Sequence, residues 1–333
     1  MSRWTQPLES SQWWRLDVRR LATNLLHRWD TQLSRIASVN PLNNIYAFLR
    51  SAIAFAGLIT LLFNPTQDLF VQVDSGGSVN CYGVAAMSYY CVMPDLDVAR
   101  IAAIVLLASI VAGLLPRWTA IPHWWIAFSF QVSSNQIEGG DQIAAITTLL
   151  LIPVALQDSR WSHWSNRDVR MNEHGRLIAH FFLTAIRLQA AIIYLASGAA
   201  KFGQEQWQDG TAMYYWLNHA TFGAPEWQQV VYQPILTNAT LVSVITWGVP
   251  ALEIIVAMAL FAGPGVRRVL FVLIALMHVG IAVSLGLVSF AIVMVALDAL
   301  YLLPMARSKR ESANRVQEGI VGSSSDRVAR VDV

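Results

Sequence analysis

Lysine is almost absent from this chain, and the setting of one of its two lysines makes that residue a candidate for chemistry. Lys309 lies near the C-terminus, whereas Lys201 directly follows a run of small residues at 196–200. Small residues let helices approach closely, so we expect neighbouring helices to enclose the Lys201 amine. Enclosure removes water and favours the uncharged amine, which can act as a general base. The alternative is that Lys201 extends to a polar surface and only anchors a helix end.

Several other ionisable side chains interrupt apolar stretches of the sequence, among them Arg187, Glu253, His278 and Asp298. If these stretches cross a membrane, such groups either pair with one another or mark a functional site. One interpretation is a buried ion pair between Arg187 and Glu253 or Asp298 that fixes helix packing. For His278, a hydrogen bond between helices and a catalytic role both remain open.

The apolar stretches have the length of membrane helices. Hydrophobic residues make up 55% of the 333 residues and charged residues 13%, against about 25% charged residues in an ordinary soluble domain. Between short charged islands the apolar stretches run for roughly 17–25 residues, as a helix that crosses a bilayer requires. We therefore expect an all-α, polytopic transmembrane helical bundle with about eight spans. They lie at 46–63, 99–115, 121–132, 142–156, 177–200, 241–261, 269–286 and 288–303.

The positions of the basic residues predict the orientation of the chain. The islands at 64–97, 133–141 and 202–238 contain aspartate and glutamate but no lysine or arginine. The other islands hold the arginines, among them Arg117, Arg160, Arg267 and Arg307. Basic residues favour the cytoplasmic side, so we expect the acidic islands to lie outside and both termini to lie in the cytoplasm.

Three regions follow from this pattern. Residues 1–44 form a cytoplasmic segment in which Leu21, Leu25, Trp29 and Leu33 recur on one helical face. This segment is either an amphipathic helix on the inner leaflet or a tail that packs on the bundle. Residues 45–305 form the transmembrane domain, and the polar residues 306–333 form a disordered cytoplasmic tail.

The two cysteines, Cys81 and Cys91, both fall in the first external island. An oxidising compartment favours a disulfide between them, although two free thiols remain possible. The seven histidines are scattered without ligand spacing, so no metal site is expected.

The sequence around Lys201 resembles a known family. The stretch YLASGAAKFGQEQWQDGTAMYYWL, from Tyr194 to Leu217, is similar to the central motif of the HTTM family, the membrane domain of vitamin K-dependent γ-glutamyl carboxylase. The stretch LMHVGIAVSLGLVSF looks like the family's histidine helix, with His278 as its histidine. Three passages resemble the bacterial sporulation-delaying protein B type: NNIYAFLRSAIAFAGLITLLFNPTQDLF, PRWTAIPHWWIAFSF and EGGDQIAAITTLLLIPVALQDSRWSHW.

The resemblance implies a site and a setting. Lys201 would be the base that acts on a quinone-type cofactor in its quinol form, with His278 as a second polar group. The partners would be a secreted antimicrobial peptide precursor and a small partner protein in the bacterial cell membrane, with no nucleic acid. Two departures argue against glutamate carboxylation: Ala200 replaces a second lysine of the family, and Ile281 replaces an asparagine.

Three further residues complete the candidate site. Asp141, in the motif EGGDQ, either caps the fourth helix or shapes the mouth of the site on the outer face. Trp207 and Tyr214 either anchor the chain at the membrane surface or line a groove for a quinone or peptide. Two functions follow: a peptide-modifying or quinol-oxidising enzyme, or a non-catalytic chaperone, export or immunity factor for a peptide toxin.

Overall fold

The computed structural model describes residues 40–70, 79, 81–135, 138–165, 169 and 171–304. The chain divides into two compact units. The larger unit comprises Pro41–Arg170 and Phe181–Ala306. Of the smaller unit, the structure describes Asn40 and Met171–His180. The N-terminal amphipathic helix and the C-terminal tail that the sequence predicts lie outside the described residues.

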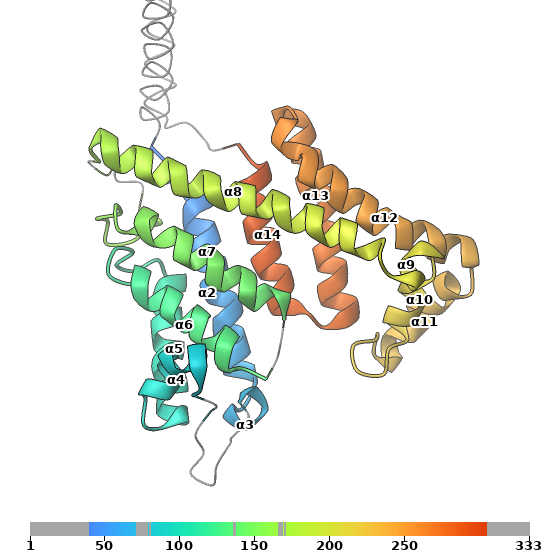
Figure 1. Cartoon of the computed structure of the whole chain (residues 1–333), viewed down its shortest axis with the longest axis horizontal. Helices are drawn as coiled ribbons and strands as arrows, with labels where there is room; N and C mark the ends of the chain where they lie inside the picture. Colours follow the sequence, from blue (N-terminus) through green and yellow to red (C-terminus); the bar gives the residue numbers. More distant parts are fainter. Residues whose placement is uncertain are drawn as a thin grey trace, which may run out of the picture. The chain divides into compact units, whose positions relative to one another are not determined.

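Helices dominate the described residues, as the sequence predicts, and Figure 1 shows their order. The eight long helices coincide with the eight predicted stretches, and no named strand occurs within the described ranges. These helices are α2 (Asn44–Phe63), α5 (Leu96–Val111), α6 (Ala120–Ser133), α7 (Gly139–Ala155), α8 (Glu173–Lys201), α12 (Ala239–Ala257), α13 (Pro264–Leu285) and α14 (Val288–Leu302). The short ones are α3 (Thr66–Leu69), η1 (Gly83–Met87), α4 (Tyr89–Val92), α9 (Glu205–Gln208), α10 (Ala212–Leu217), α11 (Glu226–Leu236) and η2 (Met258–Phe261).

Within the part of the chain that the structure describes, four segments are long and apolar enough to cross a membrane: α2, α8, α12 with η2, and α13. The apolar helices α7 and α14 are shorter, with 17 and 15 residues. A span of the hydrocarbon core takes about 20 residues. The all-α fold is therefore confirmed, while the count of eight spans stays a prediction.

Helix α14 lies at the centre of the larger unit and packs against α2, α7 and α13. All residues from Ala296 to Leu302 are buried, which is typical of a helix that is apolar on every side. The sharp entry into α14 depends on Gly286, which ends α13 with φ of +74°. Glycine adopts this left-handed conformation without steric cost, so α14 can begin two residues later and turn back along α13.

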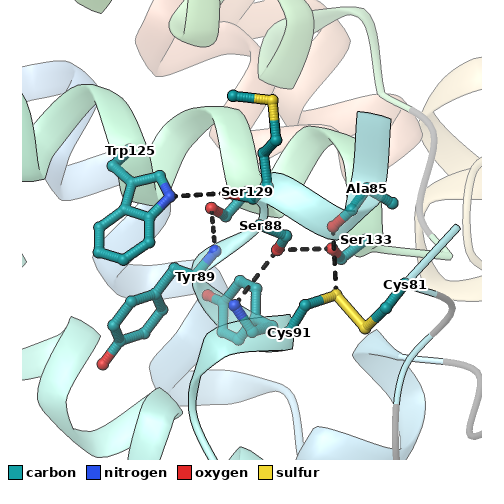
Figure 2. Close-up of a disulfide and its surroundings, with 10 residues drawn as sticks. Cys81, Ala85, Ser88, Tyr89, Cys91, Trp125, Ser129 and Ser133 are labelled. Carbon is teal, nitrogen blue, oxygen red and sulfur yellow. Dashed lines mark hydrogen bonds between the residues drawn. A yellow bond between two sulfur atoms is a disulfide. The ribbon is translucent and has the colours of Figure 1, made fainter. Parts of the chain in front are cut away.

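A disulfide joins Cys81 and Cys91 and closes a small loop against α6 (Figure 2). Three side chains of α6 hold this loop. Trp125 donates a hydrogen bond to the Met87 carbonyl at 2.9 Å, and Ser133 donates one to the Ser88 hydroxyl at 2.8 Å. The Ser129 hydroxyl accepts a hydrogen bond from the backbone N–H of Tyr89 at 2.7 Å. The loop is therefore fixed to the helix as well as closed on itself.

Candidate functional site

A cavity of about 660 Å³ lies among α8, α12, α13, α14 and the short helices α9–α11. Its walls are mostly apolar, and helix α8 contributes Tyr194, Ser197 and Lys201 to them. These three residues occur at i, i+3 and i+7, so they share one face of the helix. Glu253 of α12 and the α13 residues His278 and Ser284 add further polar side chains to the lining. The candidate residues with the strongest chemistry thus meet in one cavity.

The first polar cluster in the cavity is an ion pair between Lys201 and Glu253. The ammonium of Lys201 donates hydrogen bonds to Oε1 and Oε2 of Glu253, at 2.8 and 2.7 Å, and to the Ser197 hydroxyl at 2.8 Å. Ser197 in turn donates a hydrogen bond to Oε1 of Glu253 at 3.1 Å. An ammonium has three protons to donate, so these contacts use all of them.

Small residues allow α8 and α12 to meet at this point, as the sequence predicts. A Cβ atom added to Gly198 would lie 2.9 Å from Cγ1 of Ile254 and 3.2 Å from the carbonyl oxygen of Pro250. Real side chains do not tolerate the first of these distances, so any larger residue would push the helices apart. The glycine therefore brings Lys201 within reach of Glu253 on the facing helix.

The ion pair changes the expected state of Lys201. The sequence predicts an uncharged amine produced by burial, but a carboxylate at 2.7 Å stabilises the charged ammonium instead. Any release of a proton by Lys201 must also account for Glu253, which would otherwise remain a buried carboxylate without its cation. The two side chains therefore act as one proton-carrying unit.

The second polar cluster joins α8, α13 and α14. The Tyr194 hydroxyl donates a hydrogen bond to Oδ1 of Asp298 at 2.7 Å, and it lies 2.9 Å from Nε2 of His278. Because the phenol has only one proton, Nε2 of His278 must donate to the tyrosine oxygen. In this arrangement Nδ1 of His278 has no hydrogen-bond partner among the described residues. All three side chains are buried.

The predicted ion pairing of Arg187 is wrong. Its guanidinium donates a hydrogen bond to the carbonyl oxygen of Leu300 at 3.0 Å, and it makes no ion pair with the residues that the structure describes. Glu253 pairs with Lys201, and Asp298 binds Tyr194. Arg187 thus ties α8 to the end of α14, away from the cavity.

The other predicted site residues divide between the cavity and its surroundings. Trp207 lines the cavity, and its ring centroid lies 5.4 Å from the Lys201 ammonium, a distance that permits a cation–π contact. Tyr214 does not line it and is half-exposed, while Trp216 of the same helix does line it. Asp141 lies in the first turn of α7 and lines a different, smaller cavity. It does not cap α7, because that helix begins at Gly139, after Glu138.

Sequence reasoning missed a buried basic residue in the first span. The guanidinium of Arg50 in α2 donates hydrogen bonds to Nδ1 of His163 at 3.1 Å and to the Thr119 hydroxyl at 2.6 Å. His163 completes the network through Nε2, which lies 2.8 Å from the Ser51 hydroxyl. Burial, reinforced by the charges of Arg50 and Arg160, lowers the pKa of His163 to about 3, so this histidine is neutral. A single arginine within the apolar stretch 46–63 was the available signal.

The cavity between apolar helices defines a membrane protein with an internal polar site, and the comparisons identify its class. Residues 144–305 match the HTTM domain, and the chain belongs to the HTTM family. It is similar to the sporulation-delaying protein SdpB of Bacillus subtilis (strain 168), with 34% identity over 82% of this chain and 85% of SdpB. It is 36% identical to the uncharacterized protein YitO of the same organism, over 84% of this chain and 89% of YitO. No solved structure matches the chain.

Proposed function

We propose that this protein is an enzyme of peptide-toxin maturation that performs acid–base chemistry in the large cavity. The observation that carries the proposal is the Lys201–Glu253 ion pair on the wall of an apolar cavity of about 660 Å³. Ionisable groups at such a site are costly, and they are typical of binding or catalysis. The similarity to SdpB supports the connection with a sporulation-delaying peptide system.

The proton balance of the pair suggests how Lys201 acts as a base. The ammonium first passes a proton to Glu253, which gives a neutral amine beside a neutral carboxylic acid. The amine then takes a proton from a bound ligand and becomes an ammonium again. After this step the ligand is an anion, Glu253 carries the additional proton, and the Lys201 ammonium stabilises the new negative charge.

The lining of the cavity favours a ligand without net charge. The charges of Lys201 and Glu253 compensate each other, and no other lysine, arginine, aspartate or glutamate of the described residues lines the cavity. A quinol, which the family implies, is an apolar ring with polar oxygens and fits these walls. Lys201 of the first polar cluster and His278 of the second both line the cavity. These two side chains would hold the quinol oxygens. Such a group supplies reducing equivalents when it is bound.

The peptide would reach the site from outside the cell. Helices α9–α11 belong to the island 202–238, which contains Glu205, Asp209 and Glu226 but no lysine or arginine. Absence of basic residues favours the outer side of the bacterial cell membrane. Trp207, Trp216 and Tyr232 of these helices line the cavity and provide an aromatic surface for a peptide.

A second candidate function is a non-catalytic factor for the peptide toxin, such as a chaperone or an immunity component. The completeness of the Lys201–Glu253–Ser197 hydrogen bonds favours it, because the same contacts join α8 to α12 and could serve packing alone. A packing role requires the hydrogen bonds but no transfer of a proton.

Mass spectrometry of secreted peptides tests the proposal. A producing strain would be compared with a strain that lacks this protein and with one that carries Ser284→Ala as a matched cavity variant outside both clusters. An enzyme predicts a peptide of different mass in its absence. The same peptide mass at reduced amount would instead support the non-catalytic factor.

The predicted orientation has a separate test. An externally added thiol reagent should modify Thr221→Cys in intact cells but not Gly265→Cys.

A further inference from the structure

A second, smaller cavity lies next to the large one, and its polar lining residues are different. It measures about 30 Å³ and is lined by residues of α2, α5, α6, α7 and α14. Most of the lining residues are apolar, but they also include His123, Asp141 and Ser289. Asp141 lies in the first turn of α7, which begins at Gly139, and it lines this cavity together with residues of α6.

The polar groups of this cavity lack enough protein partners. His123 is 2% exposed, and its Nε2 atom has no hydrogen-bond partner among the described residues. A buried nitrogen without a hydrogen-bond partner is unfavourable, so such atoms normally bind water or a ligand. Ser289 donates its proton to Oε2 of Glu138 at 2.9 Å and can still accept a hydrogen bond. Three polar groups thus surround one small space.

The size and polarity of the space suit water. A buried water molecule needs about 10–15 Å³ and two to four polar partners. The cavity provides about 30 Å³ and the three groups of His123, Asp141 and Ser289. A larger ligand would not fit, and an apolar ligand would leave His123 without a hydrogen bond.

Only one layer of the protein separates this space from the large cavity. Gly139 lines the large cavity, whereas Gly140 and Asp141 line the small one. Along α14 the same alternation occurs: Ser289 and Val293 face the small cavity, and Phe290 and Met294 face the large one. The first turns of α7 and α14 are therefore the common wall.

Phe290 is the central residue of that wall. A Cβ atom on Gly140 would lie 2.9 Å from Cα of Phe290, so the two backbones touch there. The ring of Phe290 meets the ring of His278 edge-on, with centroids 5.7 Å apart. An aromatic ring at this point shields His278 from the small cavity.

We propose that the small cavity binds water through His123, Asp141 and Ser289, and that Phe290 separates this water from the His278 side of the large cavity. The role of the wall rests on the proposed function, because exclusion of water strengthens the electrostatic interactions at Lys201 and prevents side reactions. Rotation of the Phe290 ring would then admit water at one point. The binding of water does not depend on catalysis.

Radical footprinting of the full-length protein in detergent tests both parts. After transfer into heavy-oxygen water, a short X-ray pulse converts water into hydroxyl radicals, which mark the side chains beside it. Phe130 and Ile126 line the small cavity. We expect both side chains to carry the light oxygen isotope, because water held in the cavity exchanges slowly with the heavy-oxygen solvent. His123→Phe should abolish this label, and Thr147→Val, which alters a buried hydroxyl outside the cavity, should preserve it. No label at Phe130 and Ile126 in the unmodified protein would overturn the water site, whether or not the protein is an enzyme.

The separating role has its own readout. Phe290→Ala should increase the labelling of Met294 and Met277 several-fold, because both side chains line the large cavity. Ile245→Ala, a change in the same cavity on α12 and outside the common wall, should not do so. Equal labelling of these methionines in the unmodified protein and in Phe290→Ala would show that Phe290 does not separate the water of the small cavity from the large cavity.

Discussion

Lys201 and Glu253, 52 residues apart in the sequence, form a two-point ion pair with distances of 2.8 and 2.7 Å. Each side chain is the only charged partner of the other within the described residues. The pair lies on the wall of the large cavity, so its chemistry is available to a ligand. Its contribution to stability and its contribution to function can be measured separately.

Removal of one partner of the pair should destabilise the protein. Glu253→Met leaves the Lys201 ammonium without its carboxylate, and such a change in a buried pair costs about 3–5 kcal/mol. The double variant Lys201→Met with Glu253→Met should recover most of the loss, because no charge is then left without a partner. Thermal unfolding in detergent measures both. A double variant as unstable as the single one would contradict this account of the pair.

Tyr194→Phe should also be destabilising, for a different reason. It removes the donor to Asp298 and the acceptor of His278 Nε2, and each buried group left without a partner costs about 1–3 kcal/mol. Tyr46→Phe is the matched control, since the Tyr46 hydroxyl is buried without a hydrogen-bond partner among the described residues. We expect the control to unfold at or above the temperature of the unmodified protein. Equal unfolding temperatures of the two variants would refute the stabilising role of the Tyr194 hydrogen bonds.

The network of Arg50 and His163 predicts a dependence of stability on pH. The pKa of His163 is lowered to about 3 by burial and by the nearby arginines, while a histidine in the unfolded chain titrates near 6.5. Between these values the unfolded chain binds more protons, so this histidine makes stability fall as the pH falls from about 6.5 toward 3. His163→Gln should flatten that part of the profile, whereas His174→Gln at an exposed position should not. An unchanged slope in His163→Gln would contradict the assignment.

The disulfide predicts that no thiol is reactive in the native protein. Alkylating reagents should miss Cys81 and Cys91 until a reductant is added, because the structure joins the two residues. Mass spectrometry of alkylated peptides, with and without reductant, measures this. Modification of either cysteine in unreduced membranes would exclude the bridge.

The sequence predicted the helices better than it predicted the contacts between them. Twenty-residue apolar stretches locate helices because the length and the composition are local properties. The pairing of Lys201 with Glu253 is not local: with Arg187, Glu253 and Asp298 at similar depth, only the rotation of each helix decides which side chains meet. Tyr194 could have been predicted as a site residue from its spacing. It lies one helical turn before Ser197 and two turns before Lys201, on the same face of the helix. The place of Asp141 in a second cavity depends on where α7 begins, which sequence patterns fix only to within a few residues.

The most direct test of the central claim is the mass of the secreted peptide in a producing strain that carries Lys201→Arg. Arginine keeps the positive charge and can still pair with Glu253, but a guanidinium does not give up its proton in proteins. We predict a protein that inserts at the normal level and unfolds near the normal temperature, together with loss of the mature peptide mass. A mature peptide of unchanged mass and amount from this strain would contradict the role of Lys201 as a base and leave the ion pair as a packing contact.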